Sequence, residues 1–137
     1  MSNPLQMFEI SPEEISDVVS RFYARIRQHP DLGPVFAAHI DADEWPAHEE
    51  KIAAFWRNAI LKERGYDGQP MRVHLQTPEI QPEHFAQWLG LFDEVLQDTL
   101  SPELAQAFSA LANRIGNGFR YGIEQIRRPA DLPPMLG

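Results

Sequence analysis

Apolar residues recur at intervals of three and four positions over most of the chain, the period expected of amphipathic α-helices. The first such stripe consists of Ile15, Val18, Val19, Phe22 and Ile26. It follows Ser11-Pro12-Glu13-Glu14, where Ser11 suits the N-cap, Pro12 the first helical position and Glu14 the far side of a capping box. Two prolines and a glycine within residues 29–34 end this predicted helix.

Three more helices are predicted. The second begins near Asp43 or Glu44 and runs to about Lys62, with an apolar face made of Trp45, His48, Ile52, Phe55, Trp56 and Ala59. The third follows Pro82 and has an apolar face made of Phe85, Trp88, Leu89, Phe92, Val95 and Leu96. The fourth starts at Ser101-Pro102 and runs towards Ile126. Since the sequence holds no strand alternation and no internal repeat, the expected fold is all-α.

Composition narrows the class of protein. The 137 residues fit one domain, which we place at residues 1–128, followed by a proline-rich tail at 129–137 that we expect to be disordered. A net charge of −8 and a pI near 5.0 argue against nucleic-acid binding, because phosphate contacts need clustered Lys and Arg. The absence of cysteine excludes disulfides, iron–sulfur clusters and any haem bound through sulfur. Without an apolar run of about 20 residues or a signal peptide, we expect a cytoplasmic protein with no membrane partner.

His74 lies on a short segment between a turn around Gly68 and the proline-delimited residues 78–82. Met71, His74 and Leu75 share one helical face, so the imidazole is expected to point inward among apolar neighbours. Such a histidine is either a satisfied core or capping residue or an axial metal ligand whose other ring nitrogen donates to a carbonyl or carboxylate. Spacing alone leaves both interpretations open.

Three other polar rings fall on or beside apolar helical faces: Tyr23, His48 and Trp88. Each has an ordinary structural explanation, as a boundary tyrosine, a boundary histidine or a packed core tryptophan. Together with His74, in a chain without cysteine, they suggest a buried haem with a polar side opposite the iron ligand. Other chemistries lack a motif, and the adjacent pairs Glu13-Glu14 and Glu49-Glu50 are interpreted as solvated helix surface.

Taken in order, these elements resemble the truncated haemoglobins of group III over about residues 11 to 120. The absence of a Gly-Gly dipeptide fits group III and departs from the glycine motifs of groups I and II. The matching motifs are Phe22-Tyr23, Asp31-Leu32-Gly33-Pro34-Val35-Phe36, Trp45-Pro46-Ala47-His48, Phe55-Trp56, the run from Tyr66 to His74, and Pro82-Glu83-His84-Phe85 to Trp88-Leu89.

The resemblance implies a shortened globin fold in which two helix pairs sandwich a b-type haem. It makes His74 the proximal iron ligand and places Tyr23, His48 and Trp88 around the bound gas. Lys51 and Arg72 are the expected partners of the haem propionates. The other expected cofactor contacts are Phe55, Trp56, Met71 and Phe92.

A haem held by one neutral histidine leaves a position open for O2, CO or NO. Hydrogen-bond donors such as the Tyr23 hydroxyl and the Trp88 indole would slow O2 release, which argues against simple O2 delivery. We therefore expect tight binding that serves NO dioxygenation or peroxide reduction. Turnover would need a separate reductase, because the chain holds no recognisable flavin or nicotinamide domain. The alternatives are a non-catalytic O2 store, scavenger or sensor, and a helical domain that binds no haem.

Overall fold

The structure is a computed structural model, and it describes residues 7–64 and 81–127. Within these residues every regular element is helical, as the sequence predicts. The elements in chain order are α1 (Pro12–Ile26), α2 (Leu32–Ala37), the 3₁₀ turn η1 (Ala42–Glu44), α3 (Trp45–Trp56), the π-helical turn η2 (Arg57–Leu61), α5 (Pro82–Thr99) and α6 (Pro102–Arg127).

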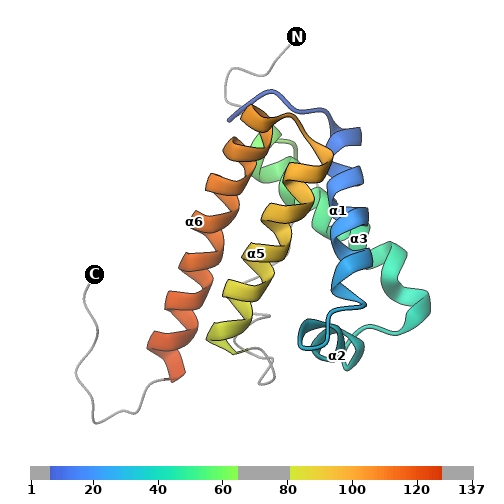
Figure 1. Cartoon of the computed structure of the whole chain (residues 1–137), viewed down its shortest axis with the longest axis vertical. Coiled ribbons are helices and arrows are strands. Elements are labelled where there is room, and N and C mark those ends of the chain that lie inside the picture. Colours follow the sequence, from blue (N-terminus) through green and yellow to red (C-terminus); the bar gives the residue numbers. More distant parts are fainter. Residues whose placement is uncertain (1–6, 65–80, 128–137) are drawn as a thin grey trace.

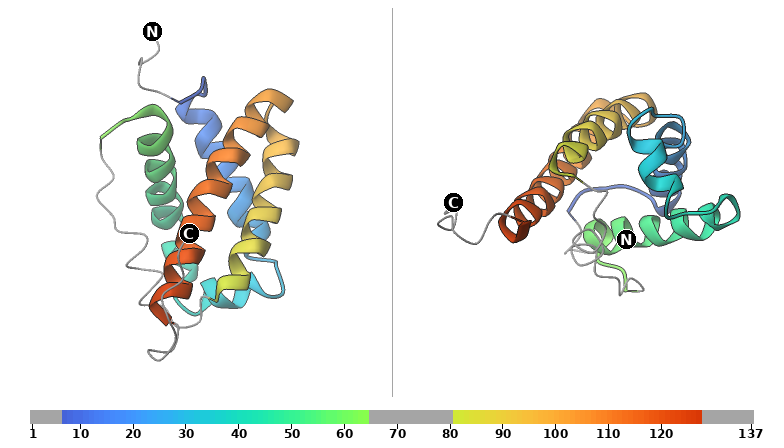
Figure 2. Two further views of the ribbon diagram at one scale, coloured as in Figure 1. Left: turned by 90° about the vertical axis from the view of Figure 1, so that its left-hand side faces the viewer. Right: turned by 90° about the horizontal axis from the view of Figure 1, so that it is seen from below.

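The four long helices form two pairs. α1 packs against α3, α5 packs against α6, and α1 also contacts α5, so that the two pairs share one core. Figure 1 shows α5 and α6 side by side and antiparallel, with α1 along α5 and α3 behind it. Seen from below in Figure 2, the α5–α6 pair forms one wall and α3 runs at an angle to it. Short α2 contacts α5 at the lower end of α1.

The predicted helix starts are confirmed in their hydrogen bonds. The Glu14 backbone N–H donates to Ser11 Oγ over 3.0 Å, and the Ser11 N–H donates to Glu14 Oε1 over 2.9 Å. This reciprocal pair satisfies two of the donors that the first turn leaves open. α6 likewise begins with Pro102, and the Leu104 N–H lies 3.4 Å from Ser101 Oγ. The apolar stripe of α1 is buried throughout.

α2 is an element that the sequence pattern does not predict. It starts because the His29 imidazole folds back as a cap: its Nδ1 accepts the backbone N–H of both Asp31 and Leu32, each over 3.1 Å. Gly33 then sits so close to the end of α1 that a Cβ would lie 3.1 Å from the carbonyl oxygen of Arg27. Glycine allows this approach, and the helix can begin beside the proline that suggested a loop.

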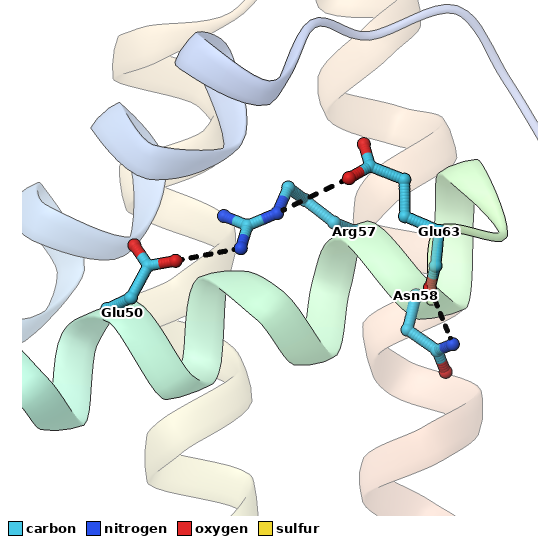
Figure 3. Close-up of polar contacts among 4 residues, drawn as sticks. All are labelled: Glu50, Arg57, Asn58 and Glu63. Carbon is cyan, nitrogen blue, oxygen red and sulfur yellow. Dashed lines mark hydrogen bonds and ion pairs between the residues drawn. The ribbon is translucent and has the colours of Figure 1, made fainter. Parts of the chain in front are cut away.

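The carboxyl end of α3 widens into a π-helical turn that is held by polar contacts (Figure 3). The Arg57 guanidinium lies 2.8 Å from Glu50 Oε1 and 3.9 Å from Glu63 Oε1, so it bridges the helix and the residues that follow it. Asn58 Nδ2 donates to the Glu63 carbonyl over 2.8 Å. Lys62 adopts the left-handed conformation with φ 62°, which reverses the chain direction and ends the helix.

Candidate functional site

Tyr23 and His48 meet where α1 packs against α3. Their ring centroids lie 5.1 Å apart and the ring planes are inclined at 82°, so one ring presents its edge to the other. Tyr23 follows directly after Phe22 on the buried face of α1 and is only 3% exposed. His48 is half-buried on the inner face of α3. Two of the three polar rings predicted from the sequence are thus in direct contact.

Two further aromatic rings complete a polar ring cluster, which consists of Tyr23, Phe36, Trp45 and His48. Trp45 lies at the start of α3, with its ring 5.6 Å from Tyr23 and 5.4 Å from His48. Phe36 comes from α2 and lies 5.8 Å from Tyr23 and 6.2 Å from His48. Three separate helices therefore supply the rings that surround the imidazole.

The imidazole in this cluster is short of hydrogen bonds. His48 Nε2 is buried and has no hydrogen-bond partner within the parts of the chain that the structure describes. Burial, with a smaller contribution from the positive charge of Lys51, lowers the pKa of His48 below its ordinary value. His48 therefore favours the neutral form, in which one ring nitrogen donates and the other accepts. A neutral, buried and unpaired imidazole can hydrogen bond to a small ligand beside it.

The tyrosine hydroxyl is also held in its neutral form. Burial, and then the negative charge of Glu49, raise the pKa of Tyr23 well above its ordinary value. The pKa of Glu49 is itself raised by burial, while Arg27 acts in the opposite direction. The interpretation of Glu49-Glu50 as solvated surface is thus wrong for Glu49, which is half-buried beside the cluster, and right for the exposed Glu50.

Trp88, the third predicted polar ring, belongs to a different group. It stacks on Phe92 with centroids 5.1 Å apart and planes inclined at 9°, and Trp56 stacks on Phe92 at 5.5 Å and 14°. We call Trp56, Trp88 and Phe92 the stacked ring cluster. Phe22 joins the two clusters, because it lies 5.1 Å from Tyr23 and 5.3 Å from Trp88. Trp88 therefore reaches Tyr23 through one intervening ring.

The remaining residues predicted to bind the haem lie on the surface, at the edge of the core, or outside the residues that the structure describes. Lys51 is exposed one turn beyond His48, and Phe55 is half-buried with its ring 5.0 Å from Trp56. The predicted iron ligand His74 and its neighbours Met71 and Arg72 lie outside the described residues. Two surface hollows open between α5 and α6, but neither is lined by a predicted residue, so neither is the expected site.

Comparison with known proteins decides the family. A family model for the bacterial-like globins matches residues 10–115, which is most of the chain. The chain belongs to the bacterial-like globin family. A group 3 truncated hemoglobin of Campylobacter jejuni is 35% identical over 113 residues, which cover 81% of this chain and 89% of the relative. The crystal structure of the group III truncated hemoglobin from the same organism is similar with a TM-score of 0.82 and 31% identity, covering 91% of this chain and all of that one.

These matches confirm the resemblance to group III and the truncated globin fold. Membership in the globin family implies that the protein binds haem and, at the haem iron, diatomic gases. The polar ring cluster fits such a group in one respect. The buried His48 Nε2 has no hydrogen-bond partner in residues 7–64 and 81–127, and a ligand could supply one. Within residues 7–64 and 81–127, no helix is long and apolar enough to cross a membrane.

In this globin, the sequence predicts Trp45 on the apolar face that carries His48, and Phe36 in a motif shared with the truncated haemoglobins, but it predicts neither as a site residue. Phe36 reaches the cluster from α2, a helix that the apolar pattern does not predict. The charges of Arg27 and Glu49 gave no signal at all, since each looks like ordinary helix surface in the sequence.

Proposed function

We propose that this globin binds a b-type haem through His74 and holds diatomic ligands tightly for redox chemistry, either NO dioxygenation or peroxide reduction. When bound, the haem supplies iron with one coordination position left for O2, CO or NO. The observation that carries the proposal is the buried His48 Nε2, which has no hydrogen-bond partner among the described residues, in a ring that contacts the buried, neutral Tyr23. Two groups that can donate hydrogen bonds meet in one place.

The protein residues act by hydrogen bonding and by excluding water. The Tyr23 hydroxyl donates a hydrogen bond to a ligand that gains negative charge. The hydroxyl keeps its proton, because burial opposes the ionisation of Tyr23. His48 can donate as well, or it can accept from a protonated ligand such as peroxide. Phe36 and Trp45 shield both groups from solvent, which strengthens their electrostatic effect on the ligand.

A hydrogen bond to a charged partner contributes about 1.5–3 kcal/mol, whereas a factor of ten in affinity needs about 1.4 kcal/mol. One donor such as Tyr23 is therefore sufficient to slow ligand release about tenfold or more. Slow release suits a reaction at the site better than delivery of O2 elsewhere. In NO dioxygenation, NO and O2 combine with one electron to give nitrate, and the electron must come from a separate reductase.

Haem binding is tested first, by reconstituting the purified protein with haemin and recording the absorption spectrum in the ferric, ferrous and CO-bound states. We expect a Soret band that His74→Ala weakens or shifts. His39→Ala serves as the matched control, because His39 is an exposed histidine just after α2 and should leave the spectrum unchanged. A spectrum that is identical in the His74 variant would contradict the assignment of the iron ligand.

Turnover is tested second, by adding NO to the O2-bound protein with a reductase and its reductant present and measuring nitrate. Many nitrate ions per haem support a dioxygenase, and hydrogen peroxide in place of NO tests peroxide reduction. A single nitrate per haem, with no peroxide consumption, would mean that the protein is a store, scavenger or sensor instead.

A further inference from the structure

The His48 imidazole is enclosed by rings from three helices. Tyr23 of α1, Trp45 of α3 and Phe36 of α2 stand at 82°, 87° and 70° to its plane. In such edge-to-face contacts the positive edge of one ring meets the negative face of another, so each contact favours one orientation of the imidazole. A side chain that swings out of the site would break all three contacts.

Trp45 is the member of this enclosure that ties the others together. It is 5% exposed, lies one turn before His48 on α3, and contacts Tyr23 and Phe36 as well as His48. The Arg27 guanidinium lies over the Trp45 ring, with its central carbon 4.9 Å from the ring centroid. This cation–π contact joins the end of α1 to the start of α3, beside the imidazole.

We propose that Trp45, held in place by Arg27, is a positioning residue that keeps the His48 imidazole inside the site as a fixed hydrogen-bonding group. The proposal rests on the proposed function, since it concerns how His48 faces a ligand at the haem. It adds two residues, Trp45 and Arg27, whose role is exerted through His48.

Two cations lie on the segments around His48. Lys51 on α3 helps burial to lower the pKa of His48, and Arg27, the C-cap of α1, lies over the Trp45 ring. Glu49 on α3 is the nearby acid, and burial raises its pKa, which limits its ability to stabilise an imidazolium. Tyr23 stays neutral, and α2 has no acidic residue in its first turn and no basic residue in its last. Protonation of His48 is therefore favoured when the imidazole leaves the enclosure for water.

The test follows His48 in the ferrous, CO-bound protein, by NMR titration of the imidazole and by the rate of CO association between about pH 5 and 8. In the wild type we expect a depressed His48 pKa and a CO association rate that changes little with pH. In Trp45→Leu the pKa of His48 should rise, and CO association should become severalfold faster as the pH falls, because the protonated imidazole moves out of the ligand's path.

Two further variants test whether Trp45 positions the His48 imidazole or only fills space in the core. Trp45→Phe keeps an aromatic ring that can meet the imidazole edge to face, and should restore most of the wild-type titration. Arg27→Met removes the cation over the ring and should shift the pKa of His48 part of the way towards that of Trp45→Leu. Arg21→Met is its matched control, because Arg21 is another exposed arginine of α1 but pairs with Asp17.

The outcomes distinguish this inference from the proposed function. If haemin gives no Soret band with the wild-type protein, the proposed function fails and the inference with it. If haem and CO bind but His48 titrates identically in the wild type, Trp45→Leu and Arg27→Met, only the inference is overturned. Should Trp45→Leu fail to fold, Arg27→Met decides, since its substitution is at an exposed side chain, and an unchanged His48 titration there overturns the proposal.

Discussion

The two ring clusters of this globin use similar side chains but pack them in opposite ways. In the polar ring cluster, Tyr23, Phe36 and Trp45 meet His48 edge to face, and its Nε2 finds no hydrogen-bond partner in the part of the chain that the structure describes. In the stacked ring cluster, Trp56, Phe92 and Trp88 lie nearly parallel, and Phe92 is 1% exposed. The first arrangement leaves a polar atom unsatisfied near a proposed ligand, whereas the second maximises apolar contact. The difference predicts that substitutions in the polar ring cluster change ligand binding most, and that substitutions in the stacked ring cluster change stability most.

The largest expected effect is on stability and comes from the stacked ring cluster. Phe92 contacts the rings of Phe22, Trp56, Trp88 and Phe108, so Phe92→Ala leaves a cavity in the centre of the core. We expect a loss of about 3–5 kcal/mol in the free energy of unfolding, measured with urea. His48→Leu is the comparison variant, because it removes an unpaired buried nitrogen and should cost little or even stabilise. Similar losses in the two variants would remove the distinction between the clusters.

The second prediction concerns ligand release from the polar ring cluster. Tyr23→Phe removes the hydroxyl alone, and should speed O2 dissociation about tenfold or more while changing stability far less than Phe92→Ala does. Stopped-flow displacement of O2 by CO measures the rate. Tyr121→Phe is the matched control, since Tyr121 is 41% exposed on α6. An unchanged rate in the Tyr23 variant would mean that His48 or Trp88 dominates.

The third prediction is a pH dependence of stability that belongs to His48. Burial lowers the pKa of His48 in the folded protein below its ordinary value of 6.5, so below that pH the unfolded chain takes up a proton that the folded protein does not. The free energy of unfolding should therefore decrease as the pH falls through about 6.5 towards the folded pKa. His48→Leu should remove this part of the decrease. If both proteins lose stability equally over that window, His48 is not held neutral.

The smallest expected effect lies in the contact between the helices that carry the two clusters. Arg25 of α1 and Asp98 of α5 form an ion pair of 2.6 Å, and their side chains are 44% and 61% exposed. Because water screens such a pair, a double-mutant cycle with alanine should give a coupling of about 0.2–1 kcal/mol that decreases with added salt. A larger coupling would show that surface charge, rather than the shared ring Phe22, joins the two regions.

The sequence predicts those features of the fold that depend on residues close to one another in the chain. Ser11 and Pro12 start α1, and Ser101 and Pro102 start α6, because N-cap hydrogen bonds depend on residues within one turn. The apolar stripe of α1 is also predicted, since its spacing depends only on the helical period, but Tyr23, expected at its edge, is buried with it. Tyr23 and His48 could be selected for the same reason, as polar rings beside an apolar face.

The sequence does not predict features that depend on contacts between segments far apart in the chain. α2 exists because His29 caps it and Gly33 packs against the end of α1, and neither contact leaves a periodic trace in the sequence. The position of Phe36 in the cluster depends on that helix, so it could not be predicted either. The ring partners of Trp88, which are Phe22 and Phe92, are likewise determined only by the packing of α5 on α1.

The π-helical turn at Arg57–Leu61 has a consequence for how this chain can tolerate length changes. A π turn corresponds to one residue inserted into an α-helix, and one residue advances an α-helix by about 100° around its axis. Deleting a single residue there would restore regular α-helical bonding but rotate Ile60 and Leu61, both buried, away from the core. It would also withdraw the Ile60 carbonyl from the Met7 N–H, which it accepts over 3.0 Å. The extra residue thus sets the direction, around the helix axis, in which the residues at the end of α3 point. Substitutions in this turn should therefore be tolerated better than deletions.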